Sequence, residues 1–200
     1  METETVFRIL LPALIVGFML HRGYYVRNHT KPDEATLKQR EEGMSSRLAS
    51  LLGMAGFFST IAHAINPAWL SWASFPLPVW ARWIGLTMAL LGFVLLQWAQ
   101  NTLSNSWSDT PRMMREQPLI TNGPYTWIRH PIYSAFLLIL GSTLLVSANW
   151  FIGLCWLGMT VIEVISRISY EESLMIEYFG DQYCSYMKQT GRLLPRLTNH

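Results

Sequence analysis

The chain has 200 residues, of which 50% are hydrophobic and only 14% are charged, whereas roughly 25% are charged in an average soluble domain. A soluble domain of this size can bury a core with far fewer apolar residues, so we expect the excess to face lipid. The formal net charge of +2 gives no support to a nucleic-acid partner. The composition therefore predicts a membrane protein.

The cysteines and histidines do not form the patterns of a disulfide framework or a metal site. Cys155 lies in an apolar run and Cys184 in a polar one, and neither has a second cysteine or a histidine at ligand spacing. The five histidines are scattered, so we expect no metal. The first apolar segment lacks a preceding basic region and a following small-residue cleavage pattern, so no cleavable signal peptide is expected.

Apolar stretches in the first half predict three membrane-spanning helices, because a bilayer core needs about 20 mostly apolar residues in a helix. These stretches are residues 6–20, extended to 25 by amphipathic residues, then 48–65 and 79–99. In the third, Arg82 is close enough to one end for its side chain to reach the head groups. The tryptophans and prolines before it predict a short external loop with an aromatic belt.

A longer apolar stretch, residues 132–165, predicts a helical hairpin. As one straight helix it would be about 50 Å long, beyond a hydrocarbon core of about 30 Å. Ser147-Ala148-Asn149 is the natural break, since Asn149 can cap a new helix starting at Trp150. We therefore expect a fourth and a fifth span, residues 132–146 and 150–165.

The residues after the hairpin predict a short amphipathic segment. Residues 170–196 are charged and aromatic, with Leu174, Phe179, Tyr183 and Tyr186 roughly at helical spacing. Gly180 should break this segment, and Gly191 and Pro195 should end it. The predicted fold class is all-α, with five transmembrane helices and a helical C-terminal segment.

Lysine and arginine counts predict the orientation in the membrane. The loop between the first two spans holds six, the next loop none before Arg82, the third loop three, the hairpin tip none and the tail four. By the positive-inside rule this alternation places the N-terminus outside and the C-terminus in the cytoplasm. The polar residues on either side of the hairpin then face the cytoplasm.

The first of these polar groups precedes the fourth span and comprises Gly123-Pro124-Tyr125, Arg129-His130-Pro131 and Tyr133. Pro131 suits the first turn of a helix, because its fixed φ is already helical and its missing N–H is not needed there. Taken alone, the pattern is typical of a helix start. Arg129 and His130 would then meet head groups, with Tyr125 and Tyr133 in an aromatic belt.

The second polar group follows the fifth span. Glu163, Arg167 and Glu171 are each four apart, so they line one helical face over about 12 Å, whereas Glu172 points elsewhere on the helix. Ionisable residues at membrane depth are costly and are usually paired or functional. An ion-pair ladder that lets the helix leave the membrane and a functional site both fit this spacing.

The hairpin brings the two polar groups together. Because its helices are antiparallel, Arg129 and His130 should emerge beside Arg167 and Glu171, as suits a pocket for a polar cofactor next to an apolar substrate. Residues 101–110, with Trp107 and Asp109, lie on the same face and could form a third wall.

These residues also carry a resemblance to a known family. Leu119 to Tyr125, followed by Arg129-His130-Pro131 and Tyr133, resembles the isoprenylcysteine carboxyl methyltransferase family and its phospholipid methyltransferase relatives. So does the tail, with Arg167, Glu171, Glu172, Leu174, Phe179, Gly180, Tyr183, Tyr186, Arg192 and Pro195. The resemblance covers roughly residues 101–196.

The resemblance implies an integral membrane methyltransferase that uses S-adenosylmethionine and takes a lipophilic substrate, such as an S-prenylated cysteine, from the bilayer. Together with the apolar stretches, it divides the chain into three N-terminal transmembrane helices in residues 1–100 and a catalytic region in residues 101–200, whose C-terminal segment is expected to close the cofactor pocket. The implied cofactor-binding residues are Tyr125, His130, Pro131, Tyr133, Glu171 and Glu172. The implied catalytic residues are Arg129, Arg167 and Glu171, with the arginines holding carboxylates.

The residue types favour one methyl acceptor over another. A carboxylate is already ionised at neutral pH and needs an arginine to position it. An amine must lose a proton, which would give His130 or a glutamate a larger role. Arg167 beside Glu171 therefore favours carboxyl O-methylation over N-methylation of an amino-phospholipid.

Two further classes of protein remain open. Membrane sterol reductases also carry an Arg-His element before a helix, so an NADPH-dependent reductase is an alternative, although Gly-Pro-Tyr and Glu-Glu favour methyl transfer. A membrane scaffold or transporter subunit is the third possibility. No pair of interrupted helices in two symmetric halves supports transport.

Overall fold

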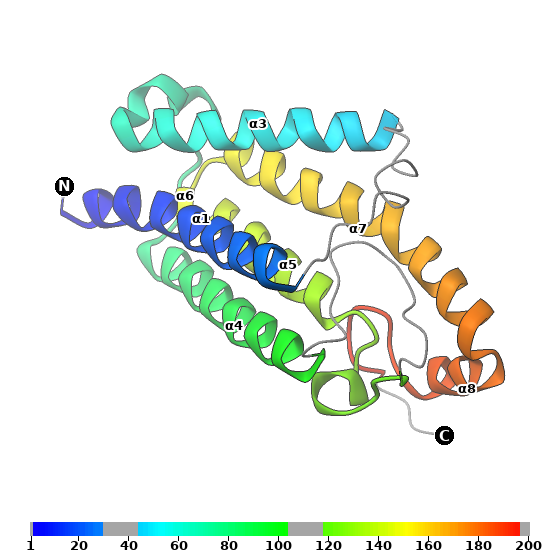
Figure 1. Ribbon diagram of the computed structural model, residues 1–200. Coiled ribbons are helices and arrows are strands. Elements are labelled where there is room, and N and C mark those ends of the chain that lie inside the picture. Colours follow the sequence, from blue (N-terminus) through cyan, green and yellow to red (C-terminus); the bar gives the residue numbers. More distant parts are fainter. Residues whose placement is uncertain (1, 30–43, 104–117, 197–200) are drawn as a thin grey trace.

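A computed structural model describes residues 2–29, 44–103 and 118–196 of the chain (Figure 1). The fold of these residues is all-α, without a β-strand. Its helices are α1 (Glu2–His29), α3 (Met44–Ile65), η1 (Pro67–Ala73), α4 (Val79–Leu103), η3 (Gly123–Thr126), α5 (Pro131–Gly141), α6 (Thr143–Ser147), α7 (Trp150–Phe179) and α8 (Asp181–Gln189).

Four of these helices, α1, α3, α4 and α7, are long and apolar enough to cross a membrane. Each contains one of the predicted apolar stretches and extends beyond it. Helices α5 and α6 occupy the predicted fourth span, as two pieces separated at Ser142. Ser142 keeps helical dihedral angles (φ −62°, ψ −23°), so the backbone departs little from a helix at this break.

The hairpin turn forms as predicted. Ala148 adopts a left-handed conformation (φ 49°) that ends α6, and the side chain of Asn149 accepts a hydrogen bond from the Ile152 N–H at 3.1 Å. This bond satisfies one of the free N–H groups at the start of α7. At Gly153 a Cβ atom would lie only 2.6 Å from the Leu144 Cα, so the two arms of the hairpin touch where they meet.

Helix α7 differs from the expected fifth span in its length. The apolar stretch ends at Ile165, whereas the helix continues to Phe179 and spans about 45 Å. The break at Gly180 is confirmed, since α8 starts directly after it. Hydropathy marks where a helix stops facing lipid, and the backbone hydrogen bonds of α7 continue past that point. The polar residues from Glu163 to Glu172 therefore stand on one continuous helix.

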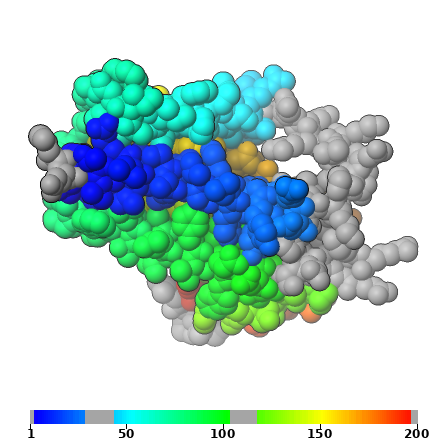
Figure 2. Space-filling model, turned by 60° about the vertical axis from the view of Figure 1, so that its left-hand side comes forward, coloured from blue at the N-terminus to red at the C-terminus, as the bar shows by residue number. Residues whose placement is uncertain are grey.

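The core lies between α1, α4, α5, α6 and α7. Helix α1 runs across the front of the bundle, with α3 on one side and α4 on the other (Figures 1 and 2). The buried apolar side chains of this core are Phe7, Leu11, Leu14, Ile15, Phe18, Ala89, Leu96, Ala135, Ile139, Leu140, Val146, Ile152 and Trp156. Outward faces carry large exposed apolar residues such as Phe58 and Val94, as expected of a surface in contact with lipid.

Arg82 corrects one expectation. Its side chain is 3% exposed instead of extending to the head groups. Its Nε and Nη2 donate to the Val146 carbonyl at 3.1 and 2.9 Å, and its Nη1 donates to Glu4 Oε1 at 2.5 Å. A carbonyl from the end of α6 and a carboxylate from the start of α1 offer these donors partners inside the protein.

The bundle has two ends that lie apart (Figure 1). One, the α8 end, comprises η3, the start of α5, the last turns of α7 and α8. The other, the α6–α7 end, comprises the start of α1, the end of α3, Arg82 and the hairpin turn. The predicted site residues lie at the α8 end.

Candidate functional site

The segment before α5 is held by the residues that follow α8. The N–H of Arg129 donates to the Gly191 carbonyl at 2.8 Å, and the N–H of His130 donates to the Arg192 carbonyl at 3.1 Å. In return the Gly191 N–H donates to the Trp127 carbonyl at 3.0 Å. The side chains of Arg129 and His130 are therefore positioned by main-chain pairing with the tail as well as by the start of a helix.

Gly191 permits this pairing. A Cβ atom there would lie 1.8 Å from the Leu194 carbonyl oxygen, a distance that no side chain tolerates. The tight turn beyond it also places the Leu193 carbonyl where it accepts a hydrogen bond from Ser134 Oγ at 2.6 Å. The turn predicted to end the C-terminal segment thus also builds one wall of the site.

Glu172 is the centre of the polar cluster. Its side chain is 7% exposed, and Oε1 accepts from Arg129 Nε at 3.1 Å and lies 3.4 Å from His130 Nε2. Oε2 accepts from Arg192 Nε at 3.1 Å and also from Arg192 Nη2. A buried carboxylate is tolerated when it is paired and its lone pairs are used, and both conditions hold here.

Arg129 links three parts of the fold. Its Nε binds Glu172 of α7, while its Nη1 donates to the carbonyls of Met187, at 3.1 Å, and Thr190 at the end of α8. A cation at this position complements the partial negative charge of a helix C-terminus. Nε and Nη1 of Arg129 therefore donate to groups of the protein itself. That Arg129 holds a bound carboxylate stays a prediction.

Glu171 faces a different set of partners. Its side chain is 23% exposed, its Oε1 accepts from the Tyr133 hydroxyl, and its Oε2 lies 3.5 Å from His130 Nδ1. The two ring nitrogens of His130 thus face two different carboxylates, Glu171 through Nδ1 and Glu172 through Nε2. The ring can donate to one of them as neutral imidazole and to both as imidazolium.

The expected face of Glu163, Arg167 and Glu171 is present, but the three do not form a simple ladder. Arg167 Nε pairs with Glu163 Oε2 at 3.0 Å, and both side chains are partly exposed. The positive charge of Arg167 also acts on Tyr133 and Glu171. Glu171 itself is turned towards α5, so the helical face leads from an ion pair into the polar cluster.

Two tyrosines, one on η3 and one on α8, lie beside the cluster. Tyr125 is buried at the end of η3, and its carbonyl accepts a hydrogen bond from the Tyr186 hydroxyl at 2.6 Å. Burial raises the pKa of Tyr125 well above its ordinary value and raises the pKa of Tyr186 to about 12. Both rings therefore stay neutral at physiological pH, and the Tyr186 hydroxyl acts as a hydrogen-bond donor.

The structure brings most of the predicted residues together. Arg129, His130, Tyr133, Glu171 and Glu172 form one connected network, and Arg167 borders it. Pro131 starts α5 as predicted, and Tyr125 contributes its backbone carbonyl. Of the expected third wall, Trp107 and Asp109 lie outside the described residues.

Sequence reasoning gave Arg192 no role beyond its place in the resemblance. The partner of Arg192, Glu172, is 20 residues earlier, and the chain reverses at Gly180 between them. In the sequence, the signal that could have suggested this return of the chain is a glycine between two helical segments. In the structure this glycine has a positive φ. Among residues 2–29, 44–103 and 118–196, no group of three or more His, Cys, Asp or Glu side chains is arranged to hold a metal ion.

Comparisons with known proteins agree with the resemblance. The model of the isoprenylcysteine carboxyl methyltransferase (ICMT) family matches residues 83–177, which include Arg129, His130, Glu171 and Glu172. The protein-S-isoprenylcysteine O-methyltransferase of Tribolium castaneum is 27% identical over 219 residues, covering 96% of this chain and 77% of that protein. Enzyme B of that name from Arabidopsis thaliana is 31% identical over 118 residues, covering 58% of this chain and 60% of that protein.

A solved structure shares the fold. The eukaryotic intramembrane Ras methyltransferase ICMT superposes with a TM-score of 0.56 and 25% sequence identity, over 78% of this chain and 53% of that one. This chain therefore spans about half of the solved protein, and 41% of a related enzyme from Xenopus laevis that is 31% identical.

Proposed function

The chain is related to the isoprenylcysteine carboxyl methyltransferase family, and on that premise we propose that it transfers a methyl group to the carboxylate of a lipophilic substrate held in the membrane. The observation that carries the proposal is that two adjacent glutamates differ in exposure and in partners. Glu172 is fully used by protein groups, whereas Glu171 is partly exposed beside His130 and Tyr133. One carboxylate holds the walls, and the other is available to a ligand.

The proposed methyl donor is S-adenosylmethionine, and the polar groups at the α8 end suit its chemistry. Its amino group and ribose hydroxyls can donate hydrogen bonds to a partly exposed carboxylate such as Glu171. The facing wall of the proposed pocket consists of Tyr125, His130, Pro131 and Tyr133. When bound, it supplies a methyl group on a positively charged sulfur. Glu172 acts by fixing Arg129, His130 and Arg192, so its part in cofactor binding is to keep this wall in place.

The acceptor is proposed to be a carboxylate, such as that of an S-prenylated cysteine. Transfer to a carboxylate would form an O–CH₃ bond while the C–S bond of the donor breaks to leave a neutral thioether, so no proton would have to be removed. The protein then needs chiefly to align the acceptor with the methyl group. Arg167 is the better placed of the two predicted arginines, because its partner Glu163 is partly exposed whereas Arg129 is enclosed by α7 and α8.

The proposed topology has five spans, with α5 and α6 together as the fourth. Pro131–Ser147 corresponds to about 26 Å of helix, close to the thickness of a hydrocarbon core. The N-terminus would lie outside, residues 1–100 would supply the first three spans, and residues 101–200 would carry the catalytic region facing the cytoplasm. A reporter fused to the N-terminus should be extracellular or periplasmic, and a cytoplasmic signal would contradict this orientation.

The first test is cofactor binding by the purified protein. We expect isothermal calorimetry to show binding of S-adenosylmethionine and none of NADPH. Glu171→Gln should weaken the affinity about tenfold or more, because a charge-assisted hydrogen bond is lost. Glu163→Gln, on the same helical face but paired with Arg167, is the control and should stay within about twofold. No heat with S-adenosylmethionine would overturn the proposal, and heat with NADPH would favour a reductase.

The second test is the chemistry of the product. We expect labelled methyl to be transferred to N-acetyl-S-farnesylcysteine and not to an amino-phospholipid. A label released by mild base would identify an ester, as the proposal requires. A base-stable label on the amino-lipid would instead identify N-methylation.

A further inference from the structure

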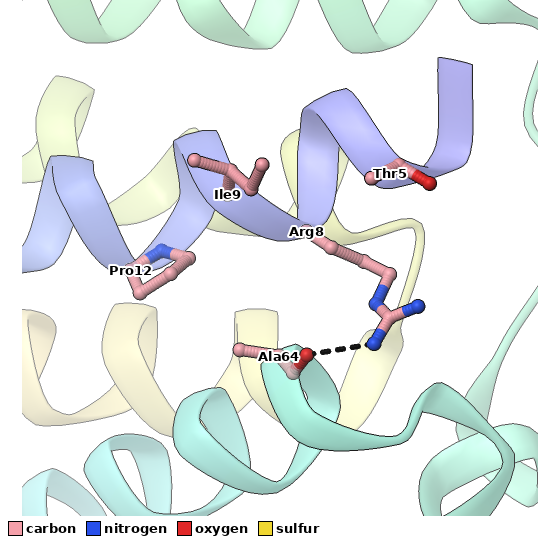
Figure 3. Close-up of a pocket in the computed structure, with 5 residues that line it drawn as sticks. All are labelled: Thr5, Arg8, Ile9, Pro12 and Ala64. Carbon is pink, nitrogen blue, oxygen red and sulfur yellow. Dashed lines mark hydrogen bonds between the residues drawn. The ribbon is translucent and has the colours of Figure 1, made fainter. Parts of the chain in front are cut away.

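A hollow of about 340 Å³ lies at the α6–α7 end (Figure 3), at the opposite end of the bundle from the polar network described above (Figure 1). It opens between α1 and α3, two of the helices that are long and apolar enough to cross a membrane. Its lining residues are Thr5, Arg8, Ile9, Pro12 and Ala64. Four come from the first turns of α1, and one comes from the end of α3.

Arg8 joins the two helices across this hollow. Its Nη2 donates to the carbonyls of Ala64 and Ile65, both at 2.8 Å, and Figure 3 shows the side chain reaching from α1 to α3. These are the last carbonyls of α3, which have no partner within their own helix. The guanidinium group has five N–H donors, and its Nε, which is buried, has no hydrogen-bond partner among the described residues.

The charge of Arg8 is also unbalanced. The nearby carboxylate, Glu4, is engaged by Arg82 at 2.5 Å, and no described carboxylate forms an ion pair with Arg8. His63, next to Ala64, is 4% exposed, and neither of its ring nitrogens has a hydrogen-bond partner among the described residues. Among the described side chains at this end, Arg82 and Glu4 therefore pair with each other, and Arg8 remains a cation without a paired carboxylate.

We propose that the hollow binds the phosphodiester head group of an anionic membrane lipid, with the phosphate on Nη1 of Arg8, which donates to no described residue, and an acyl chain along Ile9 and Pro12. A planar guanidinium matches phosphate oxygens in geometry and charge. Ile9 is 64% exposed, and this apolar wall suits a lipid better than a soluble anion.

The lipid would act as a link between α1 and α3, since it completes the coordination of the arginine that already joins them. In this position it is separate from methyl transfer, which takes place at the α8 end. Its binding is consequently expected to change stability and to leave the affinity for the methyl donor unaltered.

The test is native mass spectrometry of the detergent-purified full chain, titrated with phosphatidylglycerol, with phosphatidylcholine and with inorganic phosphate. We expect phosphatidylglycerol to form a saturable adduct and the other two to form none of comparable strength. Arg8→Gln should weaken that adduct about tenfold, because charge-assisted hydrogen bonds are lost. Arg27→Gln, an exposed arginine further along the same helix, is the matched control and should stay within about twofold.

A second variant separates lipid binding from the link between α1 and α3. Thr5→Glu keeps every bond of Arg8 to α3 but places a carboxylate three residues before it, where it can pair with the free donors. It should weaken the phosphatidylglycerol adduct about as much as Arg8→Gln. Unaltered lipid affinity in Thr5→Glu or in a folded Arg8→Gln protein would overturn the proposal, and equal binding of inorganic phosphate would reduce the site to a general anion site.

Discussion

The two ends of the bundle both bury an arginine, yet they use it differently. At the α6–α7 end Arg82 is itself the most enclosed group, and its partners are a main-chain carbonyl and Glu4, whose side chain is 67% exposed. At the α8 end the enclosed group is the carboxylate of Glu172, and three cationic or imidazole side chains surround it.

On the proposed function, this difference separates a structural cluster from the candidate binding site. Around Arg82 the donors are directed to α6 and α1, and the cluster fastens these helices. Around Glu172 the protein holds two groups that are accessible enough to accept or donate further hydrogen bonds. They are the second carboxylate, Glu171, and the half-exposed Arg192. A buried charge at a candidate site is therefore judged by whether its neighbours keep accessible polar atoms, and not by burial alone.

The largest expected effect comes from Glu172. Glu172→Gln should lower the free energy of unfolding by about 3–5 kcal/mol, because Arg129 is left buried without its counter-charge. Methyl transfer should fall at least a hundredfold, since His130 and Arg192 lose their common partner. Thermal unfolding in detergent and a methyl-transfer assay would measure the two effects.

Glu163→Gln is the control for that comparison. Its partner Arg167 is partly exposed, so the loss should be about 1 kcal/mol or less. If Glu172→Gln lowered the free energy of unfolding as little as Glu163→Gln does, the cluster at the α8 end would not be the connected unit described here.

Arg82 should show a smaller effect of a different kind. Arg82→Met removes the cation together with its donors, so the main penalty is one unpaired carbonyl at Val146, which costs about 1–3 kcal/mol. The affinity for the methyl donor should not change. Glu4→Gln should cost much less, because Glu4 is mostly exposed. A loss of donor affinity in Arg82→Met would mean that the two ends are coupled and would break the comparison.

Local signals explain which features the sequence could predict. The turn at Ser147-Ala148-Asn149, the start of α5 at Pro131 and the break at Gly180 each depend on residues within one or two turns, and each is observed. The proximity of the two polar groups followed from the hairpin alone. Local sequence signals and the hairpin were therefore enough to predict the fold class and the position of most candidate residues.

The features that escaped prediction depend on distant partners. Arg82 is buried because Val146 and Glu4, which lie 64 and 78 residues away in the sequence, meet it at the end of the bundle. Arg192 enters the site because α8 turns the chain back onto α7. Hydropathy registers the cost of placing such a charge in lipid, but it carries no information about which carbonyl or carboxylate offsets that cost.

Tyr186 offers the smallest and most local test of how the tail holds the α8 end. Tyr186→Phe removes one hydrogen bond to the Tyr125 carbonyl and should cost about 1 kcal/mol at neutral pH.

Burial raises the pKa of Tyr186 from its ordinary value of 10.0 to about 12, so folding disfavours the phenolate. The stabilising contribution is therefore complete below about pH 10 and declines as pH rises towards about 12. The gap in unfolding free energy between wild type and Tyr186→Phe should close and then reverse over that range, because the raised pKa costs the wild type more than the hydrogen bond contributes. Tyr24→Phe, at a position 61% exposed, should show no gap at any pH. A gap for Tyr186→Phe that stayed constant up to about pH 12 would mean that the hydroxyl is not held by the buried carbonyl.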